Sequence, residues 1–282
     1  MITKQVNKRG QVEFASPSEL AAYVRQEIKA GSDDYRCSKD WTGETLEEAL
    51  EFTQSGNPAR VPEAERMLDQ IEADMERMSP EWINDVAGSV PDVPAFLAGS
   101  PECMRRRVQS ISERAPVRVF VDVCSSASID HELLTKRGVA ALALVMQLIR
   151  QGRSVELYTF ASLDGEIGGQ YCPIIRQETA PIDIASVAHC LTSSGYSRTL
   201  CYGAGRSLNS YSGAFSDHFV RSGTWQQRVA GSLKTLAGYA TEKDIILPAP
   251  YADDETSNEP HGLVFKNPAA WIAACIAAVS ND

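Results

Sequence analysis

A short apolar segment, a polar turn and a long helical pattern between residues 117 and 151 most constrain what this chain can fold into. Five of the seven residues at 117–123 are valine or phenylalanine. Such a nearly unbroken apolar run is typical of a strand covered on both faces of a sheet. Leucine, alanine and valine then recur at helical spacing until Gly152 ends the pattern. Strand, turn and helix form the first half of a βαβ unit, which predicts an α/β domain.

The corner between this strand and this helix is a candidate binding site. It contains a carboxylate at Asp122, a thiol at Cys124 and a hydroxyl at Ser126. In open α/β sheets, ligands bind at the carboxyl ends of the strands. We therefore expect these side chains to face a crevice.

The rest of the C-terminal part alternates strand and helix patterns. The strand patterns are 155–160, 171–176, 244–247 and 262–265, and the helical patterns are 181–191, 200–208, 225–239 and 268–279. Alternation of this kind predicts a doubly wound, mostly parallel sheet flanked by helices. Pro173 favours an edge position for strand 171–176, and residues 192–199 are predicted to be a polar loop.

The first hundred residues carry mostly polar helical patterns, at 17–28, 45–54 and 62–78. They predict an N-terminal helical lobe over residues 1–100 and an α/β domain over residues 101–282. Residues 88–99 contain two prolines and are the candidate linker. Residues 101–113 are predicted to form a basic helix that leads into the central strand.

Charge and cysteine usage restrict the partners and the compartment. The formal net charge of −10 argues against binding to nucleic acid or an anionic membrane, because phosphate neutralisation needs a basic surface. The triplet Arg105-Arg106-Arg107 is a local exception, interpreted as a solvated face. No apolar run approaches the roughly 20 residues that span a bilayer. The seven cysteines are an odd number without a CxxC pair, which indicates reduced thiols in a cytoplasmic protein.

The order of these features resembles the von Willebrand factor A (vWA) domain. Asp122 and Ser126 at the end of the first strand match part of that family's Asp-x-Ser-x-Ser motif, and Thr199 matches its middle-loop threonine. The resemblance covers roughly residues 115–282. It implies a metal-ion-dependent adhesion site formed by Asp122, Ser126 and Thr199, with Mg²⁺ or Ca²⁺ as the ion. It also requires strands 117–123 and 244–247 to be parallel neighbours.

Two departures from the motif predict that this site is degenerate. Cys124 stands where the family has its first serine, and a neutral thiol is a poor ligand for Mg²⁺ or Ca²⁺. After the strand at 244–247 the chain reads Pro248-Ala249-Pro250, where the family has Thr-Asp-Gly, so the expected carboxylate is missing. Asp253 and Asp254 lie close enough in sequence to reach back to the crevice. A shifted motif of Ser126, Ser128 and Asp130 would instead cap the helix. No cofactor is therefore expected to be required.

These observations leave two hypotheses for function. The first is a non-enzymatic interaction or adaptor protein that binds a protein partner over Asp122, Cys124, Ser126, Thr199 and the acidic pair Asp253-Asp254. Through the vWA resemblance the partner is an AAA+ ATPase on a separate chain. Residues 99–104 and 137–140 also resemble uncharacterised tailed-bacteriophage proteins, which implies a phage or host partner in the bacterial cytoplasm. The second hypothesis is a hydrolase that uses the same crevice, with either a divalent metal or Cys124 as nucleophile.

Overall fold

The computed structural model describes residues 7, 10–32, 39–78, 82–87, 90–107, 116–124, 129, 131–164, 170–179, 181–209, 224–250, 254 and 262–280. The elements are, in chain order, β1 (Gln11–Phe14), α1 (Pro17–Lys29), α2 (Lys39–Thr42), α3 (Leu46–Ser55), the 3₁₀ helix η1 (Pro58–Arg60), α4 (Val61–Met78), β2 (Trp82–Asp85), β3 (Val90–Pro91), α5 (Val93–Leu97), β4 (Met104–Arg107), β5 (Val117–Asp122), α6 (His131–Arg150), β6 (Val155–Phe160), β7 (Leu163–Asp164), β8 (Gln170–Gln177), α7 (Ile184–Thr192), the π-helix η2 (Tyr196–Cys201), α8 (Tyr202–Asn209), α9 (Trp225–Thr235), β9 (Ile245–Leu247), α10 (Leu263–Lys266) and α11 (Pro268–Ser280).

The main sheet confirms the predicted α/β class. Its strands run in the order β1-β8-β6-β5-β9, with β7 paired to β8 at the margin. Neighbours are parallel at β1/β8, β6/β5 and β5/β9, and antiparallel at β6/β8 and β7/β8. The predicted strands 117–123 and 244–247 are therefore adjacent and parallel, with Val119 opposite Ile245 and Val121 opposite Leu247.

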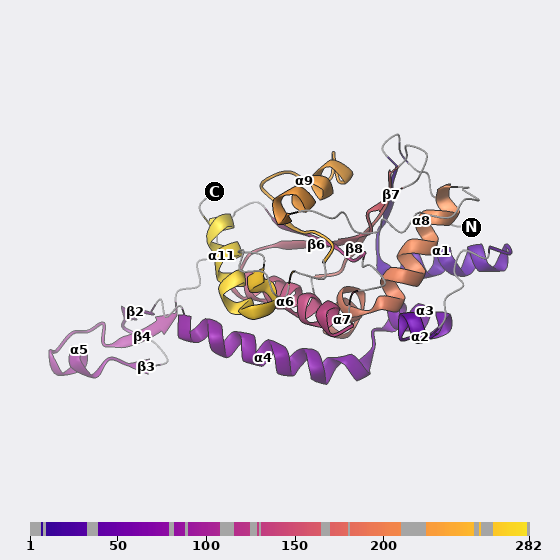
Figure 1. The fold of residues 1–282 in the computed structure, drawn as a ribbon. Helices are drawn as coiled ribbons and strands as arrows, with labels where there is room; N and C mark the ends of the chain where they lie inside the picture. Colours follow the sequence, from indigo (N-terminus) through magenta and orange to yellow (C-terminus); the bar gives the residue numbers. More distant parts are fainter. Residues whose placement is uncertain are drawn as a thin grey trace.

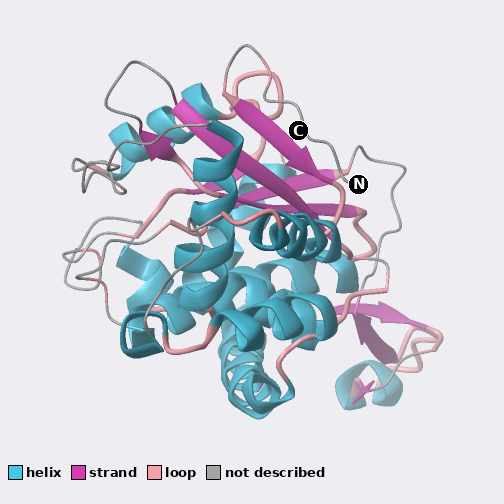
Figure 2. Ribbon diagram, turned by 90° about the vertical axis from the view of Figure 1, so that its right-hand side faces the viewer, coloured by secondary structure: helices cyan, strands magenta, loops and turns pink. Residues whose placement is uncertain are grey.

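Helices cover both faces of this sheet, as the apolar run at 117–123 predicts (Figures 1 and 2). Val119 and Val121 belong to the larger apolar cluster, which also contains residues of α1, α3, α4, α6, α7 and α11. Phe120, between them, points into a second cluster with Leu236 and residues of α9. The strand alternates between two buried faces, so both need apolar side chains.

The N-terminal helices are part of this fold. Strand β1 pairs with β8 inside the main sheet, and Gln11 Nε2 donates to the backbone oxygens of Thr235 at 2.6 Å and Ala237 at 3.1 Å. Leu20 and Leu50, from α1 and α3, belong to the same apolar cluster as the core of α6. Residues 11–78 thus share one core with the segment predicted as a separate domain from residue 101.

Several predicted elements differ from the structure. The predicted basic helix at 101–113 contains strand β4, and the predicted strand at 262–265 is helix α10. Strand β8 is interior, because β1 covers the side on which Pro173 was expected to face solvent. The predicted polar loop 192–199 is buried throughout and is helical except at Ser193, the extended residue that ends α7.

The candidate linker is part of a small projecting arm, defined here by the described residues within 82–107. It consists of the antiparallel sheet β2-β4-β3 with α5 between β3 and β4. Figure 1 shows it beyond the C-terminal end of α4, away from the main sheet. In the part of the chain that the structure describes, no helix combines the length and apolar character needed to cross a membrane.

Candidate functional site

The carboxyl ends of β5 and β9 meet around the buried guanidinium of Arg137, which projects from α6. Its Nη2 donates toward three backbone oxygens, those of Asp122 at 2.9 Å, Leu247 at 3.1 Å and Pro248 at 2.7 Å. Arg137 is 2% exposed. Burial lowers the pKa of its guanidinium to about 10, partly opposed by the charges of Asp122 and Asp254. The group therefore stays protonated near neutral pH.

Asp122 lies beside this cation, as predicted for the end of the first strand. Its Oδ1 accepts from the backbone N–H of Cys124 at 3.0 Å and from that of Ser162 at 3.5 Å. Burial raises the pKa of its carboxyl to about 6, although these hydrogen bonds and the charge of Arg137 favour the ionised form. Asp122 is 2% exposed, so its carboxyl organises the corner from inside the protein.

Cys124 is buried in the same corner. Its thiol donates to the backbone oxygen of Ser162 at 3.6 Å. Burial, reinforced by the nearby charge of Asp122, raises the pKa of the thiol well above its ordinary value. A nucleophilic cysteine needs the opposite, an exposed thiol with a lowered pKa.

A second buried arginine holds the segment that follows β9. Arg228, on α9, donates from Nη1 to the backbone oxygen of Ala249 at 2.7 Å and to Oδ2 of Asp254 at 2.9 Å. Its Nη2 also pairs with Oδ1 of Asp254. Both side chains are less than 5% exposed. The carboxylate of Asp254, which was predicted to serve the crevice, is thus bound to Arg228.

The remaining predicted site residues are placed as follows. Thr199 is 2% exposed and lies in the π-helix η2, a type of helix often found at functional sites. Arg198, next to it, donates to the backbone oxygen of Ile129 before α6 at 3.4 Å. Ser126 and Asp253 lie outside the described residues, as do Ser128 and Asp130 of the shifted motif.

The described side chains do not fit a divalent metal ion. Of the expected oxygen ligands, the carboxylate of Asp254 is engaged by Arg228, and Pro248-Ala249-Pro250 after β9 supplies no carboxylate. A guanidinium already lies against the backbone oxygens at the ends of β5 and β9. Among the described residues, no group of three or more His, Cys, Asp or Glu side chains has the spacing of a metal site.

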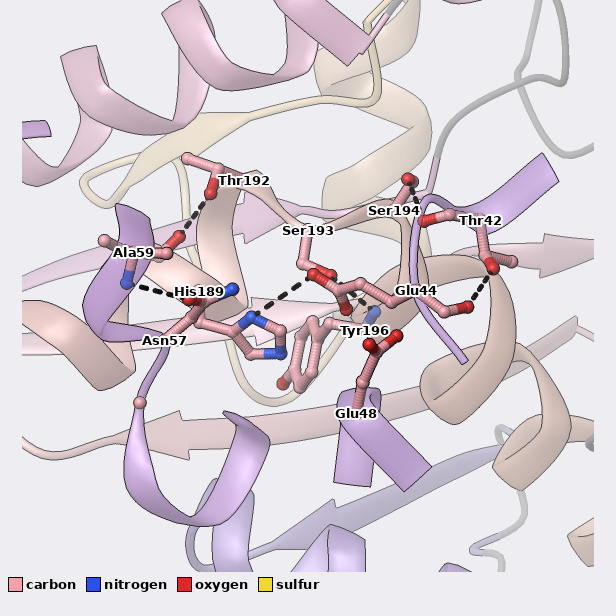
Figure 3. A network of polar contacts seen from close by, with 12 residues as sticks. Thr42, Glu44, Glu48, Asn57, Ala59, His189, Thr192, Ser193, Ser194 and Tyr196 are labelled. Carbon is pink, nitrogen blue, oxygen red and sulfur yellow. Dashed lines mark hydrogen bonds and ion pairs between the residues drawn. The ribbon is translucent and has the colours of Figure 1, made fainter. Parts of the chain in front are cut away.

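A separate buried network centres on Glu44 (Figure 3). Its Oε2 accepts from Ser193 Oγ at 2.8 Å, and its Oε1 lies 3.8 Å from His189 Nδ1. Ser193 Oγ in turn accepts from the backbone N–H of Tyr196 at 3.0 Å. The serine donates directly to the carboxylate, whereas a catalytic serine would donate to the histidine. This order of contacts does not form a nucleophilic triad.

The network instead fixes the turn before α3 to the helices of the core. Ser194 Oγ donates to the backbone oxygen of Thr42 at 2.7 Å, and Thr42 Oγ1 donates to that of Glu44 at 2.6 Å. A Cβ on Gly195 would lie 2.5 Å from Glu44 Oε2, so glycine allows the close approach. The polar residues of 192–199 therefore bind protein groups, which explains why their polarity was misleading as a loop signal.

Sequence patterns did not predict Arg137 or Arg228 as site residues. One signal was present: Arg137 stands four residues after Leu133 and four before Ala141, on the apolar stripe of its helix. A charge at such a position is unusual unless it is paired inside the protein. The hydrogen-bond partners of Arg137 are mostly backbone oxygens, and a motif made of side chains gives no sign of these.

The comparisons with known proteins give one match. A family model described as "Domain of unknown function (DUF7192)" matches residues 3–267. This range crosses the predicted boundary at residue 100. No curated protein and no solved structure matched the chain.

Proposed function

The chain belongs to the family described as a domain of unknown function (DUF7192), and we propose that it is a non-enzymatic interaction protein of the vWA type that binds a protein partner without a metal ion. The contact surface consists of the exposed residues around the carboxyl ends of β5 and β9. This end of the sheet is called the sheet edge below. The partner is an AAA+ ATPase or another phage or host protein, and the compartment is the bacterial cytoplasm.

The observation that carries the proposal is the position of Arg137. In the vWA arrangement, a cation at the end of the first strand links that strand to its parallel neighbour. Here the guanidinium makes the same link, because Nη2 reaches the backbone oxygens of Asp122 on β5 and of Leu247 and Pro248 at the end of β9. Because the guanidinium belongs to Arg137 and is part of the chain, this link needs no bound metal ion. Binding of the protein partner at this edge is therefore independent of Mg²⁺ and Ca²⁺.

The buried polar groups support an interaction role in preference to catalysis. Asp122, Cys124 and Asp254 are each at most 5% exposed, and each is bound to groups of the protein itself. They stabilise the shape of the edge, and the partner contacts the exposed residues around it. Glu132, in the first turn of α6 with a side chain 75% exposed, is one such residue.

Affinity purification from cells that make the protein tests this proposal. Glu132→Arg reverses a charge beside the sheet edge. Glu178→Arg makes the same change at an exposed position just after β8, beside the amino-terminal end of β6 and so at the opposite end of the sheet. We expect a protein that wild type and Glu178→Arg retain in EDTA and that Glu132→Arg loses. Retention that requires Mg²⁺ or Ca²⁺, or no protein that distinguishes the two variants, would contradict the proposal.

The cysteine version of the hydrolase hypothesis has its own test. Because burial raises the pKa of the Cys124 thiol, we expect Cys124 to react with iodoacetamide far more slowly in the folded protein than in urea, as mapped by mass spectrometry. Fast alkylation of Cys124 in the folded protein at neutral pH would favour the hydrolase instead.

A further inference from the structure

The large apolar side chains that are exposed in the described part of the chain all lie on the arm. They are Val86 at 68%, Val90 at 41%, Val93 at 56%, Phe96 at 67% and Leu97 at 77% exposure. Single exposed apolar residues are ordinary, but their collection on one small element marks a contact surface.

Helix α5 presents three of these side chains as a stripe. Val93, Phe96 and Leu97 stand at positions i, i+3 and i+4, which lie on one face of a helix. The helix has five residues and buries none of them. Its N-terminus is fixed by Asp92, whose Oδ1 accepts from the backbone N–H of Ala95 at 3.0 Å, so the stripe has a defined orientation. A helix this short gains little stability alone, and covering its apolar face would stabilise it.

The arm carries no formal net charge. Residues 82–107 contain three carboxylates and three arginines, whereas the whole chain carries a formal net charge of −10. The excess negative charge therefore lies outside the arm. Two copies of the chain repel one another through their bodies, while two formally neutral arms can approach without that penalty.

The position of the arm matches this distribution. Figures 1 and 2 show it projecting from the body, and Figure 1 places it beyond α4. A contact between two arms can therefore keep the acidic bodies apart, and charges separated by more than about 10 Å are largely screened at 0.1 M salt. Strand β2 lies at one edge of the arm's sheet, where a second strand can pair with it.

We propose that the arm is a dimerisation surface that binds the arm of a second copy of this chain. In a two-fold symmetric contact the same patch serves both subunits, so the patch must complement itself. The arm meets this condition, because an apolar stripe packs on an apolar stripe. On the rest of the described surface, the chain exposes no other large apolar side chain that could pack against the arm of a second copy.

Sedimentation velocity of the full chain, up to about 100 μM, tests this proposal. We expect a reversible dimer for wild type, and at least about a 100-fold weaker association for the double variant Phe96→Ser, Leu97→Ser, because two buried side chains are lost. The matched variant Phe96→Leu, Leu97→Met keeps the stripe apolar and should still dimerise. Both pairs alter exposed side chains, so circular dichroism should show unchanged folding.

Salt provides a second readout. Raising salt from about 0.05 M to about 0.5 M screens the repulsion between the acidic bodies and should leave the dimer as strong or stronger. A wild-type protein that stays monomeric over the whole concentration range would overturn the proposal. So would a dimer that the serine variant leaves intact, or one that dissociates at high salt.

Discussion

At the scale of single residues, the sheet edge is defined by how two buried charges are compensated. Burying a guanidinium or a carboxylate costs several kcal/mol unless hydrogen bonds and opposite charges replace water. Arg137 receives that compensation from three backbone oxygens. Asp122 receives it from two backbone N–H groups, but not fully, since the pKa of its carboxyl is raised to about 6.

This raised pKa predicts a pH dependence for Asp122→Asn. The folded state holds the proton more tightly than the unfolded chain, whose carboxyl has a pKa near 3.8. Asp122 therefore stabilises the fold at low pH, and this contribution is lost as the pH rises from about 4 to about 6. The shift corresponds to about 3 kcal/mol. Asparagine removes the titration and keeps an acceptor for both N–H groups.

Urea unfolding of wild type and Asp122→Asn at pH 4, 5, 6 and 7 measures this effect. The difference in unfolding free energy should favour wild type most at pH 4 and decline by roughly 2 kcal/mol by pH 7, since part of the full shift already lies below pH 4. If wild type instead gains stability over the variant as the pH rises through this range, the carboxyl is not protonated in the way described.

Sequence alone located one half of this pair. Asp122 was found because a carboxylate that ends a buried strand lies where such folds bind ligands. Arg137 was not, since its partners include the backbone oxygens of Leu247 and Pro248, more than a hundred residues away. Asp254 was identified as a crevice residue, but its pairing with Arg228 depends on how α9 lies over the sheet.

At the scale of elements, the crossing of α6 and α7 shows how close packing positions Arg137. Gly138 follows Arg137 on α6, and a Cβ there would lie 2.6 Å from the backbone oxygen of Leu191 and 2.6 Å from Thr192 Cγ2. The glycine therefore lets α7 approach the part of α6 that carries the guanidinium.

We predict that Gly138→Ala destabilises the protein by about 1–3 kcal/mol. Helix propensity alone favours alanine by about 1 kcal/mol, but the contact is with backbone, which cannot rotate away, and overpacking costs more. Chemical denaturation measures the result. Gly31→Ala is the control, since a Cβ there meets nothing within 4 Å although φ is +92°, so it carries only the backbone cost. A stabilised Gly138→Ala variant would show that the helices can separate without penalty.

Elements with strong local signals were predicted well, and those set by distant contacts were not. The strand at 117–123 and the capped helices α1 and α3 follow from apolar periodicity and from Ser16 and Thr45 as N-caps. Pro173 was expected to mark an edge, but β1 comes from 160 residues earlier to cover β8. Residues 262–265 show why a short apolar run cannot by itself distinguish strand from helix.

At the scale of the whole molecule, the N-terminal and C-terminal parts fold around one core. Strand β1 completes one side of the sheet, and α4 packs against α6 and α11. A fragment of residues 101–282 would expose β8 along its length and the apolar face of α6.

We therefore predict that the fragment 101–282 does not fold as an independent domain. It should show no cooperative thermal unfolding and should bind the dye ANS, whereas the full chain should unfold in one transition. A fragment with a cooperative transition at a similar temperature would instead support the predicted boundary near residue 100.

The central claim is that the guanidinium of Arg137 is the cation that links the ends of β5 and β9. Removing this side chain tests the claim most directly. Arg137→Ala leaves three backbone oxygens and Asp122 without the guanidinium and should cost about 3–5 kcal/mol. Free guanidinium ion can enter the space that is left, and a ligand that binds only the folded state stabilises it. At about 50 mM its denaturing effect is only about 0.3 kcal/mol or less.

The decisive measurement is the melting temperature of Arg137→Ala with and without about 50 mM guanidinium chloride, beside wild type and a sodium chloride control. We expect guanidinium to raise the melting temperature of Arg137→Ala but not that of wild type. Mg²⁺ and Ca²⁺ should leave the melting temperature of wild type unchanged. No rescue of the variant, together with stabilisation of wild type by a divalent ion that Asp122→Ala abolishes, would contradict it.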